Sequence, residues 1–199
     1  MAIYTSSWFT PLPPEVQRIG ISRGTPRNMK AGFRVYRELA PGNYFKSATI
    51  YNYRDQYMAG LLAMDPIAVR DRILGLQGDA EHCALLCYEH PQKEDDWCHR
   101  GYVAAWLFDN LKEVVCEWGM EQAGHGWQHP KIPKQFRTFE VAEPINVTPY
   151  IGATVEHNDE TWTVLDRSET YPDQAIISNG KDQRYISEAV LKKRFNPVR

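Results

Sequence analysis

Residues able to carry acid–base or nucleophilic chemistry gather in the middle of the chain, between Glu89 and Arg100. Glu89 comes directly after the apolar run Cys83–Tyr88, and Cys98-His99-Arg100 follows a polar loop. A positioned carboxylate can act as a general acid or base, a cysteine at a helix N-terminus has a lowered pKa, and histidine moves protons near neutral pH. We therefore take Glu89, Cys98 and His99 as candidate catalytic residues.

Nearby arginines indicate an anionic ligand. Arg100 falls in the first turn of the helix expected after the loop, where unpaired N–H groups and the helix dipole favour phosphate. Its guanidinium could add bidentate hydrogen bonds. Arg23, Thr25 and Arg27 follow another expected strand, and parallel strands end at the same edge of a sheet. We take Arg23, Thr25, Arg27 and Arg100 as candidate anion-binding residues.

The elements that must position these side chains have the pattern of a parallel α/β unit. The run 83–88 is continuously apolar, as in a buried central strand. The other expected elements are strands at 3–7, 16–21 and 113–118, and helices at 50–64, from Asp65-Pro66 to Gly78, and at 97–110. Strand, helix and strand in this spacing form a βαβ unit. We predict an α/β fold with a partly parallel, Rossmann-like sheet and flanking helices over residues 1–135.

Part of this pattern resembles a known family. The relevant pieces are Leu85, Leu86, Cys87 and Glu89, then Cys98-His99-Arg100 with Val103-Ala104-Ala105-Trp106-Leu107, and upstream Ile21-Ser22-Arg23-Gly24-Thr25-Pro26 with Leu39-Ala40-Pro41. Together they resemble the domain of unknown function (DUF) family 488, over about residues 1–120. The acidic loop Lys93–Asp96 and the C-terminal extension depart from the family pattern. The resemblance implies a compact α/β fold with a site at this sheet edge, and it implies no established reaction.

Each candidate residue also has a purely structural interpretation. Glu89 could cap a helix or pair with Arg100, because ion pairs perturb a carboxylate as catalysis does. Cys98 could be a small packing residue, His99 a structural histidine on a helix, and Arg100 a partner of the acidic loop. Aromatic residues could stack on a base or simply belong to the core: Tyr53, Tyr57, Trp97, Trp106 and Trp118.

The same region holds atom types that bind metals, but we expect no metal site and no cofactor. Cys87, Glu89, Cys98 and His99 supply sulfur, oxygen and nitrogen, yet they form neither a Cys-x-x-Cys pair nor a His-x-x-x-His pair. Adjacent residues such as Cys98 and His99 rarely hold one ion together from a helix. The expected site is therefore built from protein groups alone.

The C-terminal part of the chain differs from the first 118 residues in composition and in the pattern of its expected elements. Residues 119–133, rich in glycine and proline, are expected to be a loop, and residues 136–147 a linker between two domains. From residue 148 short strands alternate with Asn-Asp and Asn-Gly turn signals, which predicts a small all-β, SH3-like barrel over 148–199. The basic segment Lys192-Lys193-Arg194 could contact phosphates or form a solvated tail.

Composition excludes several classes of protein. The net charge of -2 argues against a bulk nucleic-acid binder, which usually carries a strong positive excess. No apolar run approaches the roughly 20 residues of a membrane span, and the first residues lack a signal-peptide pattern. The four cysteines lie within one third of the chain and are expected to be reduced, which predicts a cytoplasmic location.

Three functions are compatible with these residues. The first is a hydrolase or transferase acting on a nucleotide, nucleoside or nucleic acid through glycosidic-bond or phosphate chemistry. The second is a protein that binds or sequesters a nucleotide-like ligand without turnover. The third is a nucleic-acid adaptor that uses the C-terminal barrel. We favour the enzyme, because a carboxylate, a thiol and an imidazole at one strand edge exceed what anion binding needs.

Overall fold

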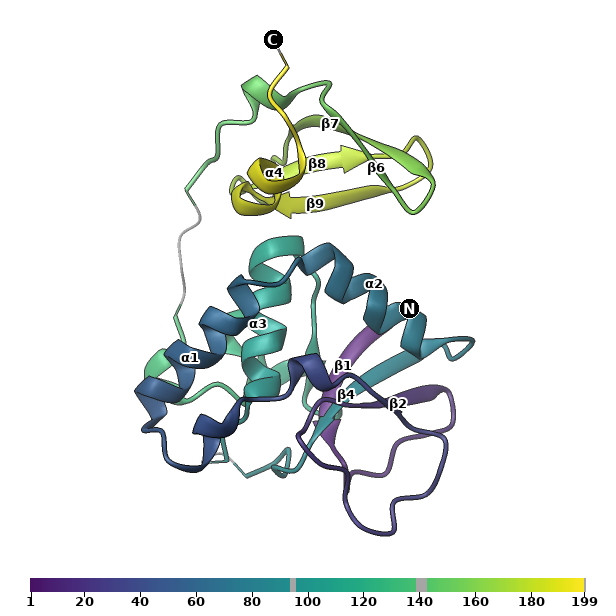
Figure 1. Ribbon diagram of the computed structural model, residues 1–199, viewed down its shortest axis with the longest axis vertical. Coiled ribbons are helices and arrows are strands. Elements are labelled where there is room, and N and C mark those ends of the chain that lie inside the picture. Colours follow the sequence, from purple (N-terminus) through teal and green to yellow (C-terminus); the bar gives the residue numbers. More distant parts are fainter. Residues whose placement is uncertain (94–95, 139–142, 199) are drawn as a thin grey trace. The chain divides into compact units, whose positions relative to one another are not determined.

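The computed structural model describes residues 1–93, 96–138 and 143–198, which belong to two compact units (Figure 1). Unit 1 comprises Met1–Phe108 and Glu113–Phe139, and unit 2 comprises Asp109–Lys112 and Glu140–Arg199. The expected linker 136–147 includes residues 139–142, and the acidic loop includes residues 94–95, so these parts of both predictions lie outside the described residues.

Within the described residues, unit 1 is built on a parallel sheet of five strands in the order β3-β2-β4-β1-β5. The strands are β1 (Ala2–Ser7), β2 (Val16–Gly20), β3 (Arg34–Val35), β4 (His82–Cys87) and β5 (Cys116–Glu117). Each of the pairings between them is parallel. The predicted α/β class with a parallel sheet is therefore confirmed.

The central strand β4 owes its place to its apolar sequence. Its residues are buried from Cys83 to Cys87, and it pairs with β1 on one side and β2 on the other. Ala84 and Leu86 pack against the buried Trp8 on one face of the sheet. Because side chains alternate along a strand, Cys83 and Cys87 belong to the opposite face. The last residue of β4 therefore offers a thiol on the face opposite the Trp8 cluster.

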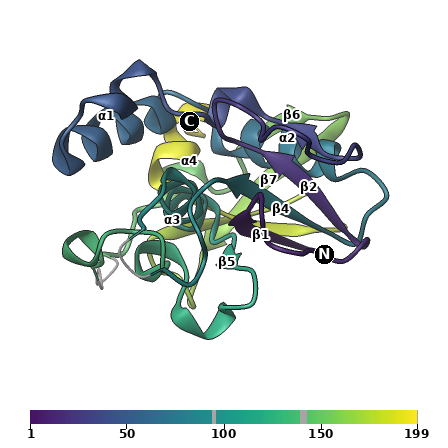
Figure 2. The ribbon, with the colours of Figure 1, turned by 90° about the horizontal axis from the view of Figure 1, so that it is seen from below.

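Three α-helices lie beside the sheet of unit 1 (Figures 1 and 2). They are α1 (Ile50–Leu62), α2 (Pro66–Gln77) and α3 (His99–Leu111). The side chain of Asp65 accepts hydrogen bonds from the N–H groups of Ile67 and Ala68, so α2 begins where its N-cap signal predicted. It ends before Gly78, whose φ of 62° is a conformation that glycine adopts readily. Among the described residues, no helix has the length and apolar character needed to cross a membrane.

The strand ends define one edge of the sheet. Ser7 of β1 is in register with Cys87 of β4, and Gly20 of β2 is in register with Leu86. The segments that leave these strands, including the one from Tyr88 to Cys98, therefore start at the same edge. Gly20 is required there, because a Cβ atom at this position would lie only 2.2 Å from the indole of Trp8.

Unit 2 contains a four-stranded antiparallel sheet in the order β6-β7-β8-β9, followed by a short helix. The elements are β6 (Thr154–His157), β7 (Glu160–Arg167), β8 (Gln174–Ser178), β9 (Gln183–Ser187) and α4 (Glu188–Arg194). Asn158 and Asp159 both have positive φ, as a two-residue hairpin turn requires.

This unit differs from the predicted all-β barrel in two respects. Within the residues described, β6 and β9 are the two edges of an open sheet and no closed barrel is found. The basic segment expected to be a patch or tail forms the last turn of α4. The Ser187 side chain caps that helix by accepting the N–H of Val190, and cations in its last turn complement the helix dipole.

Candidate functional site

A cavity of about 380 Å³ lies at the strand-end edge of unit 1. It is lined by polar groups, sulfur atoms and aromatic rings: Ser22, Arg23, Gly24, Pro41, Phe45, Tyr53, Cys87, Tyr88, Glu89, Trp97, Cys98 and His99. The structure thus brings the three candidate catalytic residues and Arg23 to one cavity. It also adds Cys87, which the sequence analysis names only as a possible metal ligand and not among the candidate site residues.

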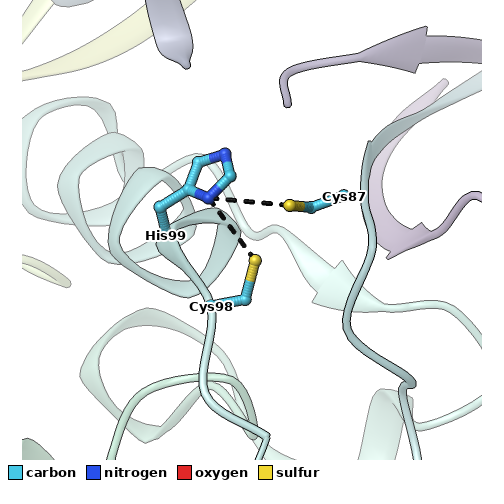
Figure 3. Close-up of side chains that lie close together, drawn as sticks. All are labelled: Cys87, Cys98 and His99. Atoms are coloured by element: carbon cyan, nitrogen blue, oxygen red, sulfur yellow. Dashed lines mark hydrogen bonds between the residues drawn. The ribbon is translucent and has the colours of Figure 1, made fainter. Parts of the chain in front are cut away.

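Cys87, Cys98 and His99 form the most compact cluster in this cavity. Figure 3 shows both sulfur atoms directed at the same ring nitrogen of His99. Nδ1 of His99 lies 3.5 Å from Sγ of Cys98 and 3.7 Å from Sγ of Cys87. All three potential ligand atoms lie within 4.8 Å of one another, and the three residues are buried.

Local structure explains how neighbours in sequence share this cluster. Cys98 precedes α3, which begins at His99, so the two residues do not sit on successive helical positions. The N–H of Cys98 donates to the carbonyl of Lys131, and its carbonyl accepts the N–H of Gly101. The sequence argument against a shared ion assumed that both residues are helical. That objection does not apply to the observed geometry.

The imidazole of His99 is held from its far side. Its Nε2 lies 3.0 Å from the carbonyl oxygen of Ile21, an acceptor to which Nε2–H donates. The ring of Tyr57 contacts the imidazole edge-on at a centroid distance of 5.4 Å, and the Tyr57 hydroxyl donates to the carbonyl of Leu39. Nδ1 is therefore fixed in position and faces the two sulfur atoms.

Charges within the cluster favour a thiolate on Cys98. Burial alone would raise the pKa of Cys98, but the hydrogen bond with Cys87 and the positive charges of His99 and Arg100 lower that pKa well below its ordinary value. Burial would lower the pKa of His99, and the adjacent Cys98 thiolate raises it instead. The pKa of Cys87 is raised by its hydrogen bond with Cys98 and by burial. These shifts favour a thiolate on Cys98 paired with a protonated His99, beside a Cys87 that keeps its proton.

Glu89 completes the cluster as a carboxyl group with a raised pKa. Burial is the main cause, followed by the interaction with the negative charge of the Cys98 side chain. Oε2 of Glu89 is buried without a hydrogen-bond partner, and it lies 3.6 Å from Nη1 of Arg100. A carboxyl group that gives up its proton closer to neutral pH is suited to general acid–base work.

Arg100 does not line the cavity. Its side chain is 0% exposed, and its Nε and Nη2 each donate to the carboxylate of Glu117 at 3.0 Å. Nη2 also donates to the backbone carbonyl of Glu89 at 2.9 Å. Arg100 therefore positions the residue that carries the acid–base carboxyl and adds positive charge near Cys98. Of the partners that the sequence suggests for Arg100, Glu89 lies 3.6 Å from Nη1, whereas residues 94–95 of the acidic loop lie outside the described residues.

A buried chain of hydrogen bonds supports Arg100. Nδ1 of His129 accepts the N–H of Lys131, so its Nε2–H is available to donate to Oγ1 of Thr5 at 2.8 Å. The Thr5 hydroxyl in turn donates to Oε2 of Glu117 at 2.7 Å. We call Thr5, Arg100, Glu117, His129 and Lys131 the support network. His129 belongs to it because the expected loop 119–133 packs into unit 1.

Lys131 ties the loop between β4 and α3 to this network. Its ammonium group donates to the backbone carbonyls of His90, Lys93 and Asp96 at 2.6, 2.9 and 3.1 Å. Its own carbonyl accepts the N–H of Cys98. A Cβ atom on Gly101 would lie 2.8 Å from the Lys131 backbone, so this close approach needs glycine.

The remaining anion-site candidates are spread over the loop after β2. Arg23 lines the cavity, lies over the ring of Phe45 at 5.3 Å, and donates from Nη1 to the carbonyl of Pro41. Thr25 and Arg27 are not among the lining residues. Ser22 does line the cavity, where it accepts the indole N–H of Trp8. The guanidinium that faces the cavity is thus that of Arg23.

A second cavity of about 460 Å³ lies in unit 2, lined by residues 144–148 and 166–169. It is the larger of the two, but its lining includes neither cysteine nor histidine and its charged residues are of both signs. The chemistry of unit 1 therefore identifies the better candidate.

Comparison of this chain with family models, curated proteins and solved structures returned no match. The resemblance to DUF family 488 therefore stays a prediction, and the function has to be argued from the site itself.

Proposed function

We propose that this protein is a hydrolase or transferase that acts on a nucleotide-like substrate in the cavity of unit 1. The observation that carries the proposal is the meeting of Glu89, Cys98 and His99 at that cavity. A ligand-binding pocket needs shape and a few polar contacts. Three reactive groups with mutually shifted pKa values are a pattern more typical of catalysis.

Each group has a role that follows from its environment. Glu89, whose pKa is raised, moves a proton to or from the reacting bond. Cys98 and His99, paired as thiolate and imidazolium, assist Glu89 as neighbouring charged groups in the same cavity. The support network fixes the backbone at both Glu89 and Cys98, so these groups keep their relative positions during turnover.

The class of substrate is proposed from the cavity walls. Phe45, Tyr53 and Trp97 offer aromatic surfaces on which a planar base can stack, and Arg23 offers a cation for a phosphate or another anion. The volume of about 380 Å³ falls in the range of small-molecule sites. Parallel α/β sheets often bind nucleotides beyond their strand ends. This proposal therefore includes a Rossmann-like sheet in unit 1, membership of DUF family 488 and an SH3-like architecture for unit 2.

The test is turnover by Glu89→Gln compared with a matched control. Purified protein is incubated with a panel of nucleosides and nucleotides, and release of free base or phosphate is followed by chromatography. Glu89→Gln should abolish turnover while substrate affinity changes little. Glu81→Gln is the control, because the exposed Glu81 precedes β4 just as Glu89 follows it.

The outcomes separate the candidate functions. Loss of turnover in Glu89→Gln alone supports the enzyme. Tight binding of one ligand without any turnover overturns the enzyme proposal in favour of a sequestering protein. Association with nucleic acid that disappears when unit 2 is altered, together with an inert cavity, overturns it in favour of an adaptor.

A further inference from the structure

We infer that Cys87, Cys98 and His99 form a binding site for a zinc ion whose fourth coordination position opens into the cavity. The inference rests on the proposed function and deepens it, since it says how Cys98 and His99 assist Glu89. It departs from the expectation that the site is built from protein groups alone.

The two sulfur–nitrogen distances in the cluster match those between ligands of a tetrahedral zinc ion. With Zn–S bonds of about 2.3 Å and Zn–N bonds of about 2.0–2.1 Å, tetrahedral sulfur and nitrogen ligands lie roughly 3.5–3.6 Å apart. Nδ1 of His99 lies 3.5 Å from the sulfur of Cys98 and 3.7 Å from the sulfur of Cys87. Each sulfur atom is therefore already spaced from Nδ1 as two ligands of one ion would be, and the three ligand atoms lie within 4.8 Å of one another.

The one N–H of His99 that faces the cluster cannot serve both sulfur atoms, and without an ion Cys87 is held through its hydrogen bond with Cys98. Nδ1 of His99 carries one hydrogen at most, and that hydrogen can point along only one N–H···S line. Both sulfur atoms nevertheless converge on this one nitrogen, as Figure 3 shows. Binding of a divalent cation would release the protons of the Cys87 thiol and of His99 Nδ1 to solvent, and the ion would then satisfy both thiolates and the nitrogen lone pair together.

The second ring nitrogen has the partner that zinc-bound histidines have. Metal-ligating histidines usually donate their other N–H to a carboxylate or a backbone carbonyl, which fixes the tautomer and raises ligand basicity. Here Nε2 of His99 lies 3.0 Å from the carbonyl of Ile21, which leaves Nδ1 as the free ligand. The backbone of Cys98 is anchored on Lys131, so two of the three ligands are held before any ion arrives.

The donor set selects the metal. Two thiolates and one imidazole are soft to borderline ligands that suit zinc and disfavour magnesium or calcium. Two thiolates would balance the charge of a divalent ion. Sites with three protein ligands and an open position are the pattern of catalytic rather than structural zinc.

Glu89 then acquires a specific task. Its Oε2 is buried without a hydrogen-bond partner in the part of the chain that the structure describes, and it lines the same cavity as the three ligands. Zinc lowers the pKa of a bound water to about 7. Such a water can give its proton to the Glu89 carboxylate, which leaves a hydroxide on the ion and a protonated Glu89 ready to return the proton to a leaving group.

The test is metal binding by the full-length chain, measured with cobalt and zinc. Reduced, chelator-stripped protein is titrated with Co²⁺, whose thiolate charge-transfer and visible bands report tetrahedral sulfur ligation, and Zn²⁺ is then added to displace it. One equivalent should bind. Cys87→Ser, Cys98→Ser and His99→Gln should each weaken zinc binding by more than about 100-fold, because losing a ligand exceeds the effect of losing an outer partner.

Cys83→Ser is the matched control. Cys83 lies in the same strand as Cys87, is equally buried and stays outside the cluster, so its loss should leave zinc affinity unchanged. Thermal unfolding of each variant shows that it is folded before titration. A cobalt spectrum without thiolate bands, or equal zinc affinity in Cys83→Ser and Cys87→Ser, would overturn the inference. So would a Cys87–Cys98 disulfide that persists in excess zinc.

The two proposals fail separately. If the protein binds no zinc through the three ligands and still turns over its substrate with a need for Glu89, the enzyme proposal stands and the zinc site falls. If zinc binds through the three ligands and no nucleotide is bound or converted, the zinc site stands and the enzyme proposal falls.

Discussion

Two buried polar clusters meet at the start of α3, and they differ in how completely their atoms are paired. In the support network, hydrogen bonds run from His129 through Thr5 to Glu117, and both oxygens of Glu117 accept from Arg100, which leaves only Nη1 of its guanidinium without a hydrogen-bond partner among the described residues. In the cavity cluster, two sulfur atoms share one nitrogen, and Oε2 of Glu89 has no hydrogen-bond partner among the described residues. Paired groups hold a structure, whereas unpaired ones are available to a ligand.

The two clusters begin at consecutive residues. His99 and Arg100 are about 100° apart around the helix axis, so one side chain reaches the cavity and the other reaches Glu117. Contact between the clusters runs through Arg100, whose Nη1 lies 3.6 Å from Oε2 of Glu89. We therefore expect substitutions in the support network to change stability first and substitutions in the cavity cluster to change chemistry first.

The largest expected effect on stability is that of Glu117→Gln. The change leaves the buried Arg100 guanidinium without its carboxylate, and an uncompensated buried charge typically lowers the free energy of unfolding by about 3–5 kcal/mol. Denaturant unfolding measures the loss. The matched control is Arg70→Gln, which breaks a partly exposed pair with Glu113 and should lower stability by about 1 kcal/mol or less. Equal losses in the two variants would show that Arg100 and Glu117 are not a buried structural pair.

The second prediction concerns His129 and pH. Burial, together with the charge of Arg100, lowers the pKa of His129 to about 3 from an ordinary value of 6.5. Between pH 6.5 and pH 3 the unfolded chain protonates His129, whereas the folded protein keeps it neutral. The free energy of unfolding therefore has its full value above pH 6.5 and decreases as the pH falls towards 3. The loss should approach about 1.4 kcal/mol per pH unit.

His129→Gln isolates this contribution. The variant lacks the titrating ring, so the difference in stability between the two proteins should narrow as the pH falls through that window. Unfolding at several pH values gives the comparison. A constant difference from pH 7 to pH 4 would contradict the buried, neutral state of His129.

The third prediction concerns thiol reactivity in the metal-free protein. Cys98 has a lowered pKa and lines the cavity, whereas burial raises the pKa of Cys83 to about 12. Because the thiolate is the nucleophile, a small alkylating reagent should modify Cys98 at least about tenfold faster than Cys83. Peptide mapping by mass spectrometry measures both rates in one sample. Preferential modification of Cys83 would refute the assignment of the thiolate.

The smallest expected effect is that of Arg23→Gln. Arg23 is exposed at the cavity and makes one backbone hydrogen bond, so stability should not change measurably. Affinity for an anionic ligand should fall by about 1 kcal/mol, because water screens an exposed charge. Calorimetry with a nucleotide and with its uncharged nucleoside tests this, since only the nucleotide should lose affinity. An equal loss of affinity for both ligands would show that Arg23 contributes to the shape of the cavity and not to recognition of the ligand's charge.

Much of the scaffold follows from local sequence signals. The apolar run from Cys83, the Asp65-Pro66 start of α2 and the Asn158-Asp159 turn each act over a few residues, and each is found where expected. The convergence of Glu89, Cys98 and His99 also follows from their positions at one strand end and the next helix start.

The partners of these residues could not be predicted in the same way. The place of Arg100 in the first turn of its helix indicates an anionic ligand. Its partner in the structure is Glu117 of β5, which is 17 residues away in the sequence. His129 reaches Thr5 over 124 residues. Pairings between residues so far apart in the sequence produce no periodic pattern and no local propensity from which they could be predicted. Cys87 is recognisable from the sequence as a possible metal ligand, but a strand buried on both faces does not show which of its side chains meets a cavity.

The most direct test of this account is anomalous diffraction from crystals of the zinc-loaded protein, with data on both sides of the zinc absorption edge. The account predicts one strong peak within about 2.4 Å of the sulfur atoms of Cys87 and Cys98 and of Nδ1 of His99. The support network should show no peak. An empty cluster in crystals that carry zinc elsewhere, or a disulfide between Cys87 and Cys98 in its place, would contradict the account.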